Sequence, residues 1–415
     1  MRSWSLFLFL VACGGEGADS TPAVVAPPAP PPVAVAPAPD APPPPPAPIP
    51  AAHPALPQIV SLGGKVLDAP RFVVVTYDGD PFRAQLEKYT ADVGASQYWH
   101  DVTAEYGVGP AIVGRPVHLS EAAPALVDDA KDLKPWLDAK LDGTHDEWDA
   151  PDGETIYVVY FPEGTTYTLD GWTGCHEFGA SDNTLVRKDG SMVPYIAIPR
   201  CPNQPGLDAW QSLTAVSSHE LFEEATDPYK DAFVTTDEDD LSWALTPPFS
   251  EIGDMCMADP ALWIVPSDLP YTVQRAWSNA AARAGKNPCV PAPATPYFAA
   301  VPVFDGLVPI AYDKFKWSGQ TRGVQIPVGQ SKTIDVALFS DAPADAWKVL
   351  AYDLSALEGN PPNLALHLDR ASGKNGDVLR LTITPLHETP EGGARFLLYS
   401  IRGTEGSFSI GWVGT

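Results

Sequence analysis

The chain has 415 residues, of which 52 are acidic and 26 are basic, so its formal net charge at pH 7 is −26. A surface this acidic repels phosphate backbones, which excludes nucleic acid as an expected partner. The length allows two globular domains beside non-globular segments, and the negative charge favours solubility and cation binding without identifying a substrate or an oligomeric state.

Residues 1–13 resemble a bacterial lipoprotein signal. One arginine precedes the apolar run LFLFLVA, which is too short to span a bilayer as a helix, and Cys13 follows directly. The segment LVAC matches the usual lipobox pattern, so the resemblance implies cleavage before Cys13 and acylation of its thiol. Gly14 favours an outer-membrane or cell-surface location over inner-membrane retention. The alternative is an ordinary secretory signal that is cut elsewhere.

Residues 14–57 are dominated by proline and alanine and cannot bury a core. This composition predicts a largely polyproline II tether. At roughly 3 Å per residue, the tether would hold the folded part on the order of 100 Å from a lipid anchor. We therefore expect an exported protein that is anchored to the cell envelope and has an extended reach.

The first folded domain is expected over residues 58–290. A β-branched run at 71–80 predicts a buried strand, and helical patterning follows over 81–109. Another helix is predicted over 125–141 and another buried strand over 154–162. This order of elements favours an α/β (α+β) domain with helices packed on a mixed sheet.

Residues 168–205 are rich in glycine, aspartate, asparagine and proline, which predicts an ordered loop region. Four cysteines remain after Cys13 is set aside, and an even number in an exported chain suggests disulfides. None of the spacings is C-x-x-C, which argues against a zinc–thiolate cluster. Our interpretation, among three connectivities, is the nearest-neighbour pairing of Cys175 with Cys201 and Cys256 with Cys289.

The segment LDAWQSLTAVSSHELFEEATDP, residues 207–228, predicts a helix that ends before its proline. Each helical residue advances by about 100°, so His219 and Glu223 lie one turn apart and Asp227 lies a further turn along. Glu220 points about 100° away from His219. A stripe of one imidazole and three carboxylates, bordered by apolar residues, is costly unless a cation satisfies it.

Zinc accepts both imidazole nitrogen and carboxylate oxygen, and a catalytic zinc site needs three protein ligands and one open position. His219 and Glu223 are the first two candidates, and Glu220 is the candidate general base. The third ligand is expected in SEIGDMC, residues 250–256, where Glu251 is the first choice and Asp254 the second.

Two other interpretations of this helix remain open. H-E-x-x-E by itself is a weak signal, because acidic helices often carry it by chance on a solvated face. Calcium is a second alternative: the number of carboxylates suits it, but the imidazole does not. The acidic run at 235–240 is interpreted as a solvated loop, again with calcium as the alternative.

The composition shifts to proline and alanine near residue 290, and the region 291–415 is expected to be a separate domain. Alternating segments separated by turn signals predict an all-β sandwich, with strands at 332–340, 378–386, 394–401 and 407–414. The region has no cluster of catalytic residue types. We therefore expect an accessory domain for binding or stability.

Six blocks between about residues 70 and 291 resemble, in order, a bacterial family of exported proteins related to the plant exordium (phosphate-induced) proteins. These blocks are YWHDVTAEYGVG, GWTGCHEFGAS, YIAIPRC, SSHELFEEATDP, SEIGDMC and VQRAWSNAAARAGKNPC. The resemblance implies an extracellular protein with a zincin-like site. His219, Glu220 and Glu223 match its helix motif, while Glu251 and Asp254 match the acidic motif that follows.

Two functional hypotheses follow. The first is a surface-anchored, zinc-dependent hydrolase of metallopeptidase type, acting on a peptide or a cell-envelope polymer. The second is a non-catalytic envelope or cell-wall binding protein that keeps a zincin-like scaffold, with a structural metal or none, and uses the β-sandwich as its working surface.

Overall fold

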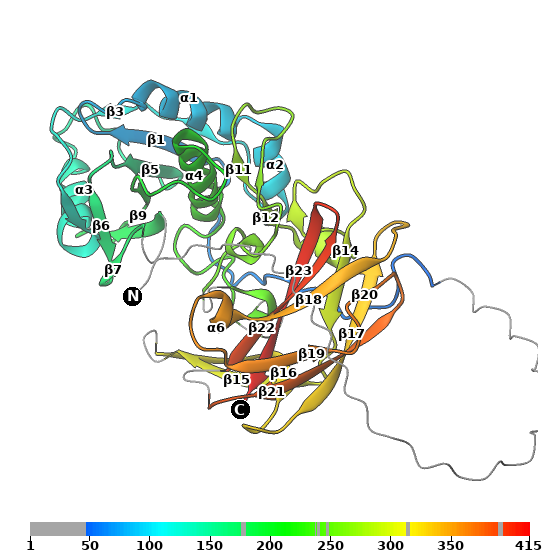
Figure 1. Cartoon of the computed structure of the whole chain (residues 1–415). Coiled ribbons are helices and arrows are strands. Elements are labelled where there is room, and N and C mark those ends of the chain that lie inside the picture. The colour runs from blue at the N-terminus through cyan, green and yellow to red at the C-terminus, as the bar shows by residue number, and fades with distance from the viewer. Residues whose placement is uncertain are drawn as a thin grey trace, which may run out of the picture.

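The computed structural model describes residues 47–175, 180–236, 238, 241–245, 249–312, 316–388 and 393–415. This part of the chain is mostly β-sheet with few helices (Figure 1). Among these residues, none of the helices has the length and hydropathy needed to cross a bilayer. The expected signal, Cys13, residues 14–46 of the tether and part of the acidic run at 235–240 lie outside the described residues.

A mixed sheet organises the N-terminal part. Its strands are β1 (Arg71–Thr76), β2 (Ile112–Val113), β3 (Val117–His118), β5 (Thr155–Tyr160), β8 (Ser181–Val186) and β9 (Met192–Ile198). They lie in the order β2–β1–β5–β9–β8, with β3 also beside β1. Strand β8 runs antiparallel to β9, whereas the other pairs are parallel. The strands predicted at 71–80 and 154–162 are thus confirmed as β1 and β5.

Helices cover both faces of this sheet. Successive side chains of a strand point to opposite sides, so both sets of side chains can be buried. The covering helices are α1 (Arg83–Gly94), α2 (Gln97–Thr103), α3 (Lys134–Lys140) and α4 (Ala209–Thr226). Val158 of β5 joins the core that contains Phe222 of α4, whereas the adjacent Val159 joins Leu137 of α3 on the other face. Figure 1 shows α1 and α4 beside β1 and β5.

The predicted loop region at 168–205 was wrong in its central part, where β8 and β9 form an antiparallel hairpin of the main sheet. The run MVPYIAI is buried almost throughout and supplies β9. The hairpin turn contains Asp189 and Gly190 and is closed by the hydrogen bond from the Arg187 N–H to the Ser191 carbonyl, so its composition resembles that of a loop. The two disulfides are the nearest-neighbour pairs Cys175–Cys201 and Cys256–Cys289.

Two predicted helices are shorter than their sequence patterns. The pattern over 81–109 breaks after α1, and Ser96 caps α2 by accepting a hydrogen bond from the Trp99 N–H. The segment 125–141 begins as β4 (Leu126–Asp128), which pairs with β6 (Thr166–Leu169) and, through it, with β7 (Trp172–Thr173). Strand pairing of the buried β-branched residue Val127 with Tyr167 therefore prevailed over the helical pattern there.

The C-terminal part is a sandwich of two sheets. One contains β14 (Phe298–Pro302), β17 (Lys332–Ser340), β21 (Val378–Pro385) and β19 (Leu364–Leu368). The other contains β15 (Gly306–Tyr312), β16 (Trp317–Gln325), β23 (Glu405–Gly414), β22 (Ala394–Arg402), β18 (Trp347–Asp353) and β20 (Ser372–Gly373). Strand β18 is followed by the short helix α6 (Leu354–Leu357). The predicted strands are confirmed as β17, β21, β22 and β23.

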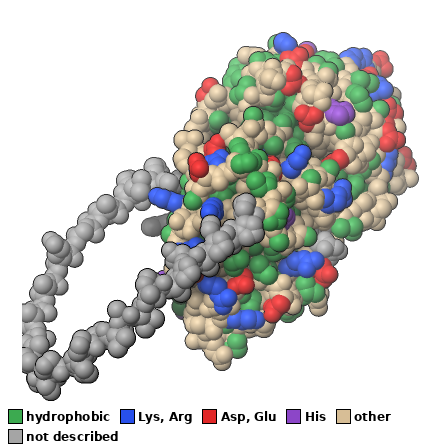
Figure 2. All heavy atoms as spheres, turned by 90° about the vertical axis from the view of Figure 1, so that its right-hand side faces the viewer, with side chains coloured by type: hydrophobic (Ala, Val, Ile, Leu, Met, Phe, Trp, Pro, Cys, Tyr) green, Lys and Arg blue, Asp and Glu red, His purple; other side chains and the backbone are tan. Residues whose placement is uncertain are grey.

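The sandwich and the N-terminal part share one hydrophobic core. Trp243 lies against Phe408 of β23, with ring centroids 5.4 Å apart. The guanidinium of Arg395 donates to the carbonyl oxygens of Ala244 and Leu245. Acidic and basic side chains are interspersed among apolar ones on the face shown in Figure 2. Because buried contacts join the two parts, they pack as one unit.

The expected tether boundary at Pro57 is corrected by the packing of residues 47–57. Ala51 and Leu56 are each only 3% exposed. The Ala51 N–H donates to the Asn375 side-chain oxygen at 3.1 Å, and the His53 ring stacks on Phe339 at 3.7 Å. A proline-rich segment has no internal hydrogen bonds, but its apolar surface can still pack on a preformed core, and composition alone missed this.

Candidate functional site

The helix that carries the candidate motif is α4, and its ends are well defined. Asp208 and Gln211 form a capping box at its N-terminus, each side chain bonding the other's backbone N–H. It ends at Thr226 because Pro228 cannot continue it. Leu221 and Phe222 are fully buried in the core, which fixes the rotation of the helix. His219, Phe222 and Glu223 face the loop at 250–256, where Gly253 lies against all three side chains.

His219, Glu223 and Asp254 converge at the C-terminal half of α4. The Nε2 atom of His219 lies 2.7 Å from Oε2 of Glu223 and 3.7 Å from Oδ1 of Asp254. The N–H groups of Gly253 and Asp254 donate to Oε1 of Glu223 at 2.9 and 3.1 Å. The side chains of His219 and Asp254 are 16% and 21% exposed, so a small ligand can reach the group from solvent.

The loop that supplies Asp254 is held from several sides. The Gln274 amide donates to the Gly253 carbonyl oxygen, and the Trp277 N–H donates to that of Ile252. Cys256 is bonded to Cys289 next along the loop. A Cβ atom on Gly253 would lie 2.7 Å from both Glu223 Oε1 and His219 Nδ1, so only glycine allows this approach.

Glu251 lies on the other side of Glu223, in a group around Lys230. The Lys230 ammonium pairs with Asp182 of β8, lies 3.1 Å from Oε2 of Glu251 and lies 4.0 Å from Oε2 of Glu224. Glu251 and Asp254, the two candidates for the third ligand, therefore have different partners. Asp254 is grouped with His219, whereas Glu251 is grouped with a lysine.

Two sets of three side chains could each hold a metal ion. They are His219, Glu223 and Asp254, and Asp182, Glu223 and Glu251; within each set the candidate ligand atoms lie within 4.8 Å of one another. The first set combines one imidazole with two carboxylates, and the second contains carboxylates alone. Glu223 belongs to both sets.

Glu220, the candidate general base, is only 5% exposed. Burial raises the pKa of its carboxyl well above the ordinary range, and the neighbouring charge of His219 partly offsets that rise. For His219, burial opposes protonation, but Glu223, Glu220 and Asp254 raise its pKa well above the ordinary value. Burial and the Glu223 charge raise the pKa of Asp254 to about 7. The raised pKa values of Glu220 and Asp254 mean that, without a bound cation, protons neutralise part of the negative charge of this group.

Three residues of this region were not found by sequence reasoning: Asp182, Glu224 and Lys230. Asp182 stands in the segment expected to be loop, and Lys230 follows the helix without any motif. Glu224 did carry a signal, since it lies one turn after Glu220 on the same helix. It is completely buried, and neither of its carboxylate oxygens has a hydrogen-bond partner among the described residues.

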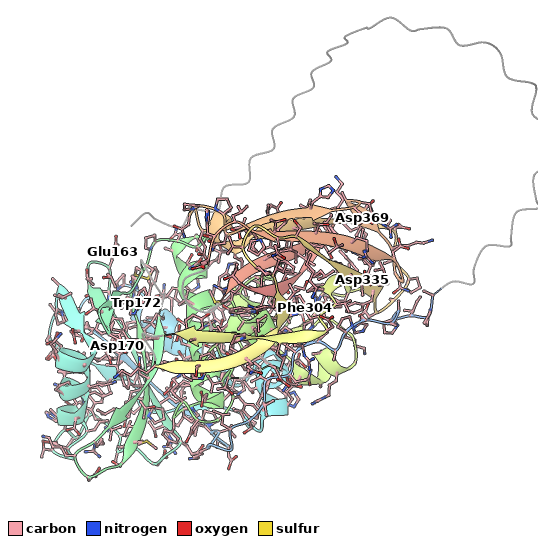
Figure 3. All side chains as sticks on the ribbon, turned by 90° about the horizontal axis from the view of Figure 1, so that it is seen from below. Glu163, Asp170, Trp172, Phe304, Asp335 and Asp369 are labelled. Carbon is pink, nitrogen blue, oxygen red and sulfur yellow. A yellow bond between two sulfur atoms is a disulfide. The ribbon has the colours of Figure 1, made fainter. Side chains whose placement is uncertain are left out.

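A cavity of about 500 Å³ opens beside the first half of α4. Its helix wall consists of Ala209, Ser212, Leu213 and Val216, and Phe82, Ile198 and the segment 199–204 line the other sides. His219 lies three residues beyond Val216, about 4.5 Å along the helix axis. Glu163, which also lines the cavity, is labelled on the N-terminal part in Figure 3. The cavity therefore lies about one helical turn from the His219 group.

The metal-free protein is expected to be more stable at about pH 5.5 than at pH 8. Burial raises the pKa of Asp227 to about 6, and Asp254 is raised as well. The folded chain thus binds these protons at a higher pH than the unfolded chain, so stability is lost as the pH rises through about 6 to 7. Thermal melts should show a midpoint a few degrees higher at pH 5.5.

Asp227→Asn provides the control for this pH dependence, because it keeps the oxygen that accepts the Ala232 N–H and removes the buried charge. Its midpoint should change less between the two pH values. A wild-type midpoint that rises towards pH 8 would contradict the expectation.

No protein-family model matches the chain, and no curated protein gives a significant match. Three solved structures are similar to 28–29% of its length. They are the titin M10–obscurin-like 1 Ig complex (13% identity, 91% of that chain, TM-score 0.17), the titin M3 domain (11%, 94%, 0.17) and a chimeric titin Z1Z2 carrying a decorin peptide (13%, 94%, 0.16). These TM-scores are too low to support an argument about this chain.

Proposed function

We propose that the chain is a zinc-dependent hydrolase of zincin type, with a peptide or a cell-envelope polymer as its substrate. The convergence of His219, Glu223 and Asp254 at a partly exposed position carries this proposal. The helix is fixed by its buried face and the loop by Gln274 and a disulfide, so the donor atoms are held by rigid elements.

The donor set fits zinc. One imidazole nitrogen and two carboxylate oxygens are common zinc ligands. Ligands about 2.1 Å from a tetrahedral ion lie about 3.4 Å from one another. The Nε2 atom of His219 lies 2.7 Å from one carboxylate oxygen and 3.7 Å from the other, so small side-chain shifts would suffice. In this proposal Asp254 replaces Glu251 as the third ligand, and Glu251 supports Lys230.

Zinc held there would supply Lewis acidity, polarising a substrate carbonyl and making a water molecule more acidic. The protein's own part falls to Glu220, whose carboxylate accepts a proton from the attacking water and returns it to the leaving group. Burial raises the pKa of this carboxyl, which makes its ionised form a stronger base, and a cation bound nearby would favour that ionised form. The cavity along α4 would receive the substrate beside the reacting bond.

The scaffold around the site is proposed to be a zincin-like domain over residues 58–290, with the sandwich as an accessory domain. The mixed sheet with α4 packed on one face is consistent with this assignment. Two disulfides are typical of exported proteins. We also propose lipid attachment at Cys13, which would place the hydrolase at the outer membrane or cell surface.

Metal analysis of the purified full-length chain tests the proposal. Wild type should carry about one equivalent of zinc, and His219→Ala should carry little, because it removes the only nitrogen ligand of the set. Exposed His367 lies on the sandwich, and His367→Ala should retain the metal. Wild-type protein that takes up no zinc after incubation with it would refute the assignment.

One observation favours the second candidate function, a non-catalytic envelope-binding protein. Both oxygens of Glu223 already have partners, Oε1 in two backbone N–H groups and Oε2 in His219. Such mutual satisfaction also suits a structural site. Firmly bound zinc with no hydrolysis of any peptide or envelope polymer would support this function.

A further inference from the structure

The carboxyl group of Glu224 lies next to the Lys230 group and lacks hydrogen-bond partners among the described residues. Its side chain is fully buried, and neither carboxylate oxygen accepts a hydrogen bond from a described residue. The nearest cation, the Lys230 ammonium, is 4.0 Å from its Oε2 atom. A buried carboxylate without a donor or a close counter-ion is strongly disfavoured.

A single ammonium cannot balance the carboxylates that surround it. Lys230 is shared among Asp182, Glu251 and Glu224, and the first two take its closest contacts. Asp227, also fully buried, leaves its Oδ2 atom without a hydrogen bond among the described residues. The group therefore has more carboxyl groups than one ammonium can pair with, and those beside Glu224 are disfavoured as carboxylates unless a further cation binds.

We propose that Asp182, Glu223 and Glu251, whose candidate ligand atoms lie within 4.8 Å of one another, form a second cation site beside the buried Glu224, specific for a hard divalent ion and best suited to calcium. The donors are carboxylate oxygens alone, which suit calcium, magnesium or manganese rather than zinc. Calcium tolerates the irregular, many-oxygen geometry that these side chains offer, whereas magnesium requires a near-regular octahedron. The site shares Glu223 with the His219 group, and its other ligands, Asp182 and Glu251, lie outside that group.

A divalent ion would bind here by displacing the Lys230 ammonium. Its ammonium lies between Asp182 and Glu251, where the cation would bind, and its side chain is 38% exposed. The ammonium can therefore leave towards solvent when a divalent ion enters. The entering ion has twice the charge, so it stabilises the nearby Glu224 carboxylate more strongly than the lysine does.

Calcium titration of the purified full-length chain, by calorimetry or by competition with terbium luminescence, tests this site. Wild type should bind one calcium ion here. Asp182→Asn and Glu224→Gln should each weaken that binding at least about tenfold. Lys230→Met should strengthen it by a similar factor, because the competing ammonium is gone. Asp345→Asn, which alters an exposed carboxylate of the sandwich, should bind like wild type.

Asp182→Asn and Glu224→Gln each introduce a side chain of nearly the same shape as the original, and thermal melts of the two variants show whether they fold. Equal affinity in wild type, Asp182→Asn and Glu224→Gln would overturn the proposal, as would failure of both wild type and Lys230→Met to bind. Binding by Lys230→Met alone would support the site, with the ammonium as the stronger competitor in wild type. Because the two sites share Glu223, calcium is titrated into the zinc-free chain and zinc into the calcium-free chain. Calcium binding without zinc binding refutes only the hydrolase, and zinc binding without calcium binding refutes only this site.

Discussion

Replacing Glu220 with glutamine is expected to leave the zinc content unchanged and to slow hydrolysis by about 10²- to 10⁴-fold. Glutamine keeps the size of the side chain but cannot accept the proton of the attacking water. Glu220 is not in the His219, Glu223 and Asp254 set, so the donor atoms for zinc remain in place. The measurement pairs metal analysis with cleavage assays on peptide and envelope-polymer libraries.

The matched control is Glu147→Gln, which makes the same chemical change at an exposed position of the N-terminal part. It should retain both zinc and activity. Full activity in Glu220→Gln would show that another group accepts the proton. Loss of zinc in that variant would show instead that Glu220 is itself a ligand or is needed to hold one.

Gly253→Ala is expected to weaken zinc binding by about 10- to 100-fold and to lower stability by about 1–3 kcal/mol. The added Cβ atom would meet Glu223 Oε1 and His219 Nδ1 at 2.7 Å each, and Phe222 at 2.8 Å. Phe222 is fully buried, so the loop must move away and take Asp254 with it. Zinc titration and thermal melts of the same samples measure the two effects.

Gly306→Ala is the control for this substitution, because a Cβ atom there meets nothing within 4 Å and its backbone does not need glycine. It should leave zinc binding and the melting midpoint unchanged. Normal zinc affinity in Gly253→Ala would mean that the close approach of the loop to α4 is not needed to form the site.

Residues with strong local signals were predicted correctly from the sequence. The strand at Arg71–Thr76 contains the β-branched run VVVT, and α4 has both a capping residue and a terminating proline. The hairpin of β8 and β9 was missed because its pairing is set by neighbouring strands, whereas its composition resembles a loop. The local sequence pattern determines whether an isolated helix or strand forms, but pairing with a neighbouring strand determines the structure of a segment at the edge of a sheet.

The candidate site shows the same division. The positions of His219, Glu220 and Glu223 relative to one another follow from helix geometry alone. Which of Glu251 and Asp254 faces His219 depends on the turn at Gly253 and on its hydrogen bond from Gln274, neither of which a motif contains. Lys230 and Asp182 reach the site from separate elements, so only the fold brings them together.

The packed segment at 47–57 determines how an anchored form of this protein would face its surroundings. A free tether ending at Pro57 would attach the protein flexibly beside the mixed sheet, and the His219 group could then point in any direction. Ala51 is instead hydrogen-bonded to Asn375, and His53 stacks on Phe339. The point of flexible attachment therefore lies at the sandwich. The sandwich would then carry the attachment point, and the packing of the sandwich against the N-terminal part would fix the distance from that point to the cavity beside α4.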